Sequence, residues 1–173
     1  MLQLDAHICR LRALEPEDVE MLYIWENDVE VWRVSGTMAP LSYERLQRFV
    51  EEQSYDLYAT RQMRLVVEAE GRAVGSVDIF DFEPQHLRCG LGVLIYAHDD
   101  RRKGYARAAI EATISYARNT LGLRQVWVQI AQDNAASIAL FESLGFERCA
   151  HRRDWLRRGT QYIDVYDYQL LFE

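Results

Sequence analysis

An apolar strand that runs through a basic turn into a long helix constrains the fold of this chain more than any other feature. Residues 87–96 (LRCGLGVLIY) are almost continuously apolar, which is typical of a strand at the centre of a sheet. A helix is predicted over residues 104–121, where apolar residues recur at helical spacing. Another apolar strand is predicted over 124–131. These segments therefore predict one strand–helix–strand unit within the sheet.

The segments on either side of this unit predict further strands and helices. Alternating or apolar runs bounded by turn residues indicate strands within residues 8–14, 63–69, 73–82, 146–156 and 161–172. Helical spacing and capping residues indicate helices within residues 15–28, 39–53 and 133–146. With 3 prolines, 9 glycines and no linker-like tract, residues 1–173 are expected to form a single domain. The expected fold class is α/β (α+β), with a mixed, mostly antiparallel sheet of about seven strands flanked by four helices.

Composition and charge argue against several classes of protein. The chain has a net charge of -7 and 49% hydrophobic residues, which is ordinary for a soluble globular protein and unfavourable for a general nucleic-acid binder. No apolar run approaches the ~18 residues that span a bilayer, and the first residues lack the apolar core of a signal peptide. A cytoplasmic protein with no nucleic-acid or membrane partner is expected. No group of His, Cys and Asp has metal-ligand spacing, so no metal site is expected.

The turn before the long helix has the composition of an anion site. The first N–H groups of a helix lack intrahelical partners, and the helix dipole places positive potential beside them. Gly104 has no Cβ, so a ligand phosphate has access to the main chain there. The basic residues 101–103 would add positive charge, although a solvated turn that balances Asp99 and Asp100 is the alternative. Because Tyr105 follows Gly104, the ending of a P-loop motif is absent.

A second group of residues lies on the helix predicted within 133–146. Asn134, Ser137 and Phe141 are spaced i, i+3 and i+7, which places them on one face of that helix. A capped amphipathic helix, with Asn134 helping to cap it, explains the same residues. The spacing by itself therefore leaves a ligand site and a purely structural role open.

Together the two motifs resemble those of the GCN5-related N-acetyltransferase (GNAT) family. The run R-R-K-G-Y-A is similar to the family motif R/Q-x-x-G-x-G/A, with Arg101, Gly104 and Ala106 at the three defining positions. The run from Asn134 to Phe146 is similar to the family pattern N-x-x-S-x-x-L-F/Y-E-x-L-G-F. The two motifs are in the family order, and the resemblance extends to nearly the whole chain. It resembles the branch that contains ribosomal-protein N-terminal acetyltransferases and spermidine or diamine N-acetyltransferases.

The resemblance implies an acetyl-CoA (coenzyme A) site between splayed central strands. In the family the cofactor lies between the strand before the basic turn and the next strand, which here means residues 93–96 and 128–131. Main-chain N–H groups at about 102–107 would hold its pyrophosphate. The cofactor-binding residues that the resemblance implies are Leu94, Ile95, Tyr96, Arg101, Arg102, Lys103, Gly104, Tyr105, Ala106, Arg107, Asn134, Ser137 and Phe141.

Acetyl transfer to an amine sets requirements that this sequence meets only in part. An alkylamine has a pKa near ~10.4 and must lose its proton before it attacks. Many relatives carry a tyrosine as general acid where this chain has Phe141, so the catalytic residues stay unknown. Catalysis is expected to rest on positioning, with a proton path through water. Glu26, Asp28 and Asp78 are candidate contacts to a cationic acceptor, and a structural or solvent-facing role is the alternative for each.

The resulting prediction is an acetyl-CoA-dependent N-acetyltransferase that moves an acetyl group to a primary amine by direct attack. A polyamine-like small molecule is the expected acceptor. Two alternatives remain. One is transfer to the N-terminus of a (ribosomal) protein, in which the acceptor is a peptide amine, and the other is a catalytically idle CoA-binding regulatory module. The sequence leaves a homodimer open.

Overall fold

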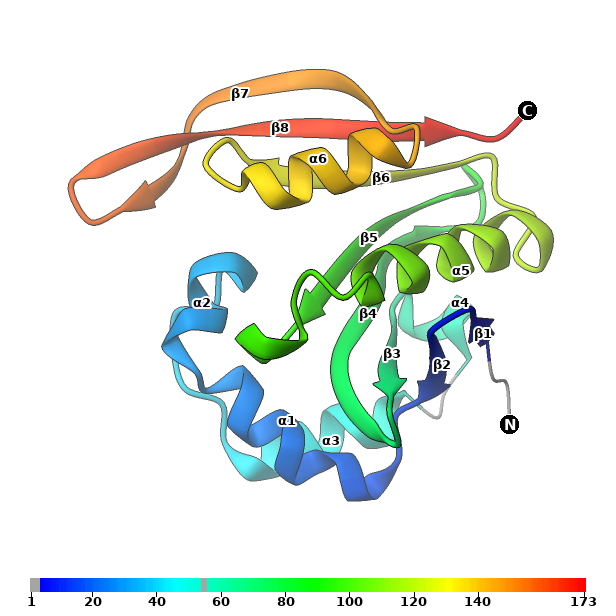
Figure 1. Cartoon of the computed structure of the whole chain (residues 1–173), viewed down its shortest axis with the longest axis vertical. Helices are drawn as coiled ribbons and strands as arrows, with labels where there is room; N and C mark the ends of the chain where they lie inside the picture. The colour runs from blue at the N-terminus through cyan, green and yellow to red at the C-terminus, as the bar shows by residue number, and fades with distance from the viewer. Residues whose placement is uncertain (1–3, 54–55) are drawn as a thin grey trace.

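An eight-stranded sheet extends through the molecule in the computed structural model, which describes residues 4–53 and 56–173 (Figure 1). The strands are β1 (Leu4–Ala6), β2 (Cys9–Ala13), β3 (Met63–Ala69), β4 (Arg72–Glu83), β5 (Arg88–Ile95), β6 (Gln125–Ala131), β7 (Glu147–Arg158) and β8 (Gln161–Leu171). In space they lie in the order β1-β2-β3-β4-β5-β6-β8-β7. Neighbouring strands are antiparallel except β5 and β6, which are parallel. The predicted mixed, mostly antiparallel sheet is confirmed.

In the described residues, six α-helices connect these strands, together with 3₁₀ turns at Pro16–Asp18 and His98–Asp100. The helices are α1 (Val19–Glu26), α2 (Val29–Ser35), α3 (Tyr43–Glu52), α4 (Leu57–Thr60), α5 (Tyr105–Asn119) and α6 (Ala135–Ser143). The sequence predicts four helices and about seven strands, and the structure adds α2, α4 and the three-residue β1. The α2 segment is rich in valine, a weak helix former, and its ends depend on an Asp28 N-cap and a left-handed Gly36.

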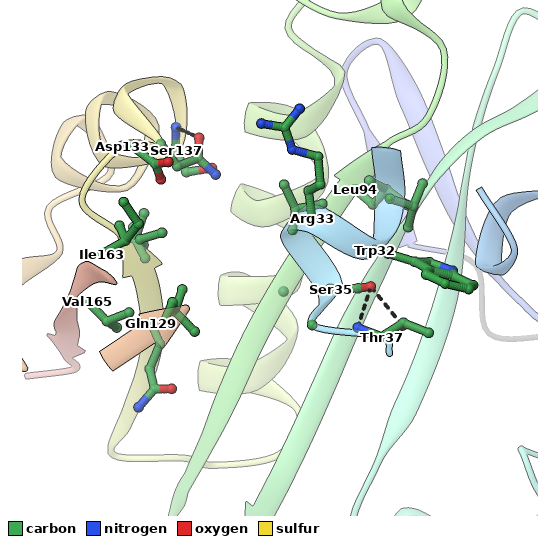
Figure 2. A pocket seen from close by; sticks show the side chains of 18 of the residues that line it. Trp32, Arg33, Ser35, Thr37, Leu94, Gln129, Asp133, Ser137, Ile163 and Val165 are labelled. Atoms are coloured by element: carbon green, nitrogen blue, oxygen red, sulfur yellow. Dashed lines mark hydrogen bonds between the residues drawn. The ribbon is translucent and has the colours of Figure 1, made fainter. Parts of the chain in front are cut away.

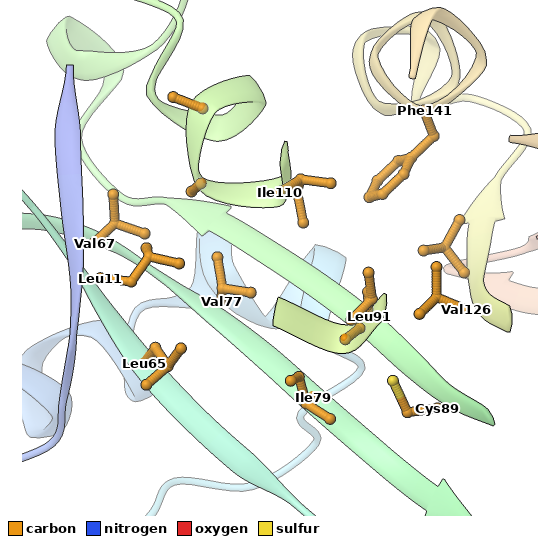
Figure 3. Packing of buried hydrophobic residues seen from close by; sticks show 14 of the residues in the cluster. Leu11, Leu65, Val67, Val77, Ile79, Cys89, Leu91, Ile110, Val126 and Phe141 are labelled. Carbon is orange, nitrogen blue, oxygen red and sulfur yellow. The ribbon is translucent and has the colours of Figure 1, made fainter. Parts of the chain in front are cut away.

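The helices cover both faces of the sheet. Because side chains alternate along a strand, Leu65 and Val67 of β3 face α5, where they join the main core with Ile110 (Figure 3). Val66 points to the opposite face and packs in a second cluster with residues of α1 and α3. Within the described residues, none of the helices has the length and apolar character needed to cross a membrane.

The central strands β5 and β6 separate along their length. They are paired only from Arg88 opposite Gln125 to Gly90 opposite Trp127. Beyond that point β5 stays paired with β4 as far as Ile95, and β6 stays paired with β8 as far as Ala131. Each strand therefore remains in its own half of the sheet while a gap opens between them. The expectation of splayed central strands is confirmed.

Candidate active site

A cleft of about 1210 Å³ occupies the gap between β5 and β6 (Figure 2). Residues 91–94 of β5 and 128–131 of β6 line it, together with α2, the loop after α2, the start of α6 and the β7–β8 hairpin. In Figure 2, α2 with Arg33 lies on one side of this gap, and Ile163 and Val165 of β8 lie on the other. The cleft therefore lies where two halves of the sheet part, the usual place for a ligand in a sheet with parallel strands.

The basic turn follows β5 at the edge of the sheet where the gap is open. Two residues of this turn have left-handed backbone conformations, Arg102 with φ +64 and Gly104 with φ +88. Gly104 is the N-cap of α5 and makes no side-chain cap hydrogen bond. In the described part of the chain, the main-chain N–H groups of residues 102–107 have no protein acceptor. These are the groups that the family resemblance assigns to a pyrophosphate, and their free N–H bonds fit an anionic ligand.

A buried carboxylate holds this turn. Asp100 is 2% exposed and accepts two hydrogen bonds from Arg72 of β4, at 2.7 and 2.6 Å, and one from Lys103 at 3.2 Å. The hydrogen bonds from Arg72, the largest influence, lower the pKa of Asp100 to about 2. Arg101 is also engaged, because its guanidinium donates to the carbonyl oxygens of Ile95 and Tyr96 at 3.2 and 3.0 Å. Two of the three basic side chains thus shape the turn.

Arg102 and the first residues of α5 differ in whether their side chains are available to bind a ligand. Arg102 is exposed and has no side-chain partner within the described residues. The Tyr105 side chain is buried and its hydroxyl donates to Glu70 Oε1 at 3.2 Å, so only its main chain is available to the turn. Arg107 donates to Ser143 Oγ and, at 3.3 Å, to Glu111. Ala106 is half-buried, and its small side chain leaves the start of the helix accessible.

The start of α6 lines the cleft, as the second motif predicts. Asn134 is its N-cap, and Asn134 Oδ1 accepts a hydrogen bond from the N–H of Ser137 at 3.2 Å (Figure 2). The structural explanation of Asn134 therefore holds, and both residues also line the cleft. Phe141, which Figure 3 shows in the main core, is 4% exposed. Its ring packs edge-on against that of Phe146, with centroids 5.1 Å apart. Phe141 therefore forms part of the apolar wall of the cleft and has no proton to donate.

The residues at the end of β5 and just after it differ in whether they line the cleft or contact the N-cap of α2. Leu94 lines the cleft, whereas Ile95 and Tyr96 are not part of its lining. The Tyr96 hydroxyl donates to Asp28 Oδ2 at 3.0 Å, and this hydrogen bond is the main reason that the pKa of Tyr96 is raised. Asp28 Oδ1 accepts the N–H of Glu30 at 2.9 Å. Asp28 therefore caps α2 outside the cleft lining, which favours the structural alternative for this residue.

The other two acidic candidates lie in the cleft around an arginine that the sequence interpretation missed. Arg64 donates Nε to Asp78 Oδ1 at 2.6 Å, Nη2 to Asp78 Oδ2 at 3.2 Å, and Nη1 to Glu26 Oε1. All three residues line the cleft. Burial, the largest single influence, lowers the pKa of Arg64, but the two carboxylates together outweigh it and raise that pKa above its usual value. The pair Glu26 and Asp78 thus carries a built-in counterion.

Comparison with known proteins agrees with this geometry. The model of the acetyltransferase (GNAT) domain family matches residues 9–147. This chain belongs to the GNAT family.

Several GNAT relatives match most of the chain. Spermidine N(1)-acetyltransferase of Vibrio cholerae is 24% identical over 156 residues, 90% of this chain and 88% of the relative. An N-acetyltransferase 9-like protein of Caenorhabditis briggsae is 31% identical over 155 residues, 84% of this chain and 78% of the relative. The crystal structure of the Vibrio cholerae spermidine N-acetyltransferase with CoA and spermine superposes with a TM-score of 0.83 at 23% identity, covering 93% of this chain and 94% of that one.

Membership of the GNAT family makes this protein an acetyltransferase that uses acetyl-CoA. The residues present fit that donor. The free N–H groups of residues 102–107 suit its phosphates, and the gap between β5 and β6 offers unpaired strand edges to an extended chain. Acetyl-CoA supplies the activated acetyl thioester, and the cleft supplies the place where an amine reaches it.

Proposed function

We propose that this GNAT acetyltransferase transfers its acetyl group to a primary amine, and that the acceptor is a polyamine-like small molecule. The observation that carries the proposal is the gap between β5 and β6. The acidic pair Glu26 and Asp78 lines the same cleft as the strand edges that would bind the cofactor. Relatives named as spermidine N-acetyltransferases support the acceptor class.

In this proposal the main chain holds the donor. The N–H groups of residues 102–107 bind the pyrophosphate, with Arg102 as the nearest free cation, and the edges of 91–94 and 128–131 orient the thioester arm. Orientation of two reactants in one site accounts for much of the rate that such an enzyme needs. Among the other predicted residues, Asn134 and Ser137 border the arm from α6.

The acidic residues of the cleft act on the acceptor. A carboxylate beside the gap attracts the ammonium form of an amine, and water in the open cleft takes the proton that is lost before attack. Phe141 has no hydroxyl, so the proposal contains no side-chain general acid. A thiol of pKa about 8.5 leaves as the thiolate and takes a proton from solvent.

The experiment is an acceptor screen that measures thiol release from acetyl-CoA in the presence of monoamines, polyamines, aminoglycosides, amino acids and peptides with free N-termini. Turnover with small amines supports the proposal. Turnover confined to peptide N-termini would replace it with the alternative of N-terminal acetylation. CoA binding with no turnover on any amine would favour an idle regulatory module, which the absence of a tyrosine at Phe141 keeps in view.

We also propose that residues 1–173 work as one domain, because one sheet joins strands from Leu4 to Leu171. A cytoplasmic location and a homodimer stay predictions. Size-exclusion chromatography with light scattering tests the second.

A further inference from the structure

The cleft contains a fixed cation between two carboxylates. Arg64 lies opposite Asp78 in the β3–β4 ladder and binds both of its carboxylate oxygens, while its third nitrogen binds Glu26 at the end of α1. The Arg64 side chain is 19% exposed, and its guanidinium carbon lies 5.2 Å from the centroid of the Phe49 ring. Contacts from β4, α1 and α3 therefore hold this guanidinium in one place.

The charges of this cluster do not cancel. Two carboxylates and one guanidinium leave a net charge of one negative unit. Both oxygens of Asp78 are bound to Arg64, and Glu26 uses only Oε1. Among the described residues, no partner lies on Glu26 Oε2, and Glu26 lines the cleft. One carboxylate oxygen thus remains for a hydrogen-bond donor of a ligand.

The cluster lies beside the start of the gap. Asp78 is paired with Gly92 of β5, and the pairing of β5 with β6 ends two residues earlier, at Gly90. Because Gly92 has no side chain, nothing from β5 stands between the cluster and the gap at this level. Gly92, Asp78, Arg64 and Glu26 all line the same cleft. A second amino group on an acceptor whose first amine enters the gap would meet this cluster.

We infer that Arg64 sets the charge preference of the acceptor site. It occupies, as part of the protein, the place that one substrate ammonium would take between Glu26 and Asp78. The acceptor that fits carries one ammonium besides the reacting amine, as a diamine does, and Glu26 binds that ammonium. Longer polyamines bring further ammonium groups toward a guanidinium that repels them. This inference rests on the proposed transfer to a small amine.

The test compares acceptors of increasing charge in two variants of Arg64. The acceptors are n-butylamine, 1,4-diaminobutane, spermidine and spermine, and the quantity is kcat/KM from thiol release. In Arg64→Met the cluster carries two uncompensated negative charges, so the ratio of kcat/KM for spermine to that for 1,4-diaminobutane is expected to rise about tenfold. Arg64→Lys keeps the positive charge and is expected to keep the ratio of the parent protein. An unchanged ratio in Arg64→Met overturns the inference.

Arg12 offers a matched control outside the cleft. It binds Asp18 at 2.7 and 2.9 Å and Glu68 at 2.8 Å, so it also links two carboxylates between a strand and neighbouring elements. Arg12→Met is expected to lower the melting temperature in the same way as Arg64→Met and to leave the acceptor ratio unchanged. A similar change of ratio in Arg12→Met would attribute the effect to loss of stability and overturn the inference.

Glu26→Gln tests the binding oxygen independently of whether Arg64→Met folds. It is expected to lower kcat/KM about tenfold for 1,4-diaminobutane and to have a much smaller effect on n-butylamine, because only the diamine has a second ammonium for Glu26 to bind. Equal losses for both acceptors overturn the inference. Absence of turnover by the parent protein on any amine counts against the proposed function instead. In that case calorimetric titration of spermine and 1,4-diaminobutane into the same variants measures the ratio of their association constants, which is expected to change in the same direction.

Discussion

Gly104→Val is expected to weaken CoA binding strongly while the protein still folds. Gly104 has φ +88, a conformation that costs a residue with a side chain about 1–2 kcal/mol. The added Cβ would lie 3.1 Å from Ile8 Cδ1, the end of a flexible side chain that has room to shift slightly. For a chain of this size each kcal/mol lowers Tm by about 2–4 °C, so a loss of about 2–8 °C is expected by calorimetry.

The expected effect on CoA binding is larger than the effect on stability. The valine side chain would stand beside the free N–H groups of residues 102–107, where the phosphates approach. A hydrogen bond to a charged group contributes about 1.5–3 kcal/mol, so losing two of them corresponds to about 3–6 kcal/mol. The Kd for CoA, measured by titration calorimetry, is therefore expected to rise at least about 100-fold.

Gly122→Val is the matched control for this variant. Gly122 has φ +63 and follows the other end of α5, and its added Cβ would meet nothing within 4 Å. The backbone strain is of the same kind, so a similar loss of Tm is expected with unchanged CoA affinity. If Gly104→Val and Gly122→Val bind CoA as tightly as the parent protein does, the turn does not hold the pyrophosphate and the reasoning is refuted.

Three further predictions concern Asp100, the buried carboxylate that holds the turn, and Phe141 in the apolar wall of the cleft. Asp100→Asn is expected to raise the Kd for CoA, since Arg72 and Lys103 lose the carboxylate that orients the turn; an unchanged Kd in titration calorimetry would contradict this. Because the folded-state pKa of Asp100 is lowered to about 2, its stabilisation is complete above the unfolded pKa of ~3.9 and is lost as pH falls toward 2. The difference in Tm between the parent and Asp100→Asn is therefore expected to be constant from pH 7 to 5 and to shrink below pH 4; a difference that grows on acidification would reverse the sign. Phe141→Tyr is expected to raise kcat with small amines by supplying a proton donor at the cleft wall, and a kcat equal to that of the parent would show that no acid was missing.

Local signals were sufficient for most elements of the fold. The strand predicted at 63–69 coincides with β3, and α3 lies within the helix predicted at 39–53, where Ser42 Oγ caps it by accepting the N–H of Arg45 at 3.2 Å. Strand alternation and N-caps act within a few residues, so the sequence displays them directly. The α2 helix had a weaker signal, because three of its seven residues are valine, a weak helix former. Its N-cap Asp28 is also held by Tyr96, which follows β5 and is distant in sequence.

The residues of the candidate site also fall into two groups, those that local sequence signals predict and those that long-range contacts position. The glycine turn, its free N–H groups and the Asn134 cap follow from a short stretch of chain, and they were predictable for that reason. Long-range contacts decided the roles of the charged residues. Lys103 is bound to Asp100, which also binds Arg72 of β4, a residue distant in sequence.

The sequence by itself determined where seven of the strands, four of the helices and the glycine turn before α5 lie, since periodicity, caps and glycines are local properties. The tertiary structure alone decided the charge of the cleft. Counting back from the turn at Glu70 and Gly71 in a regular hairpin would place Arg64 opposite Val77. An irregularity in the pairing at Val67 and Glu68 shifts the register by one residue, and Arg64 instead lies opposite Asp78. Because a shift of one residue changes every later partner in a ladder, this irregularity places the cation beside Asp78, and the packing of α1 against the sheet brings Glu26 to it.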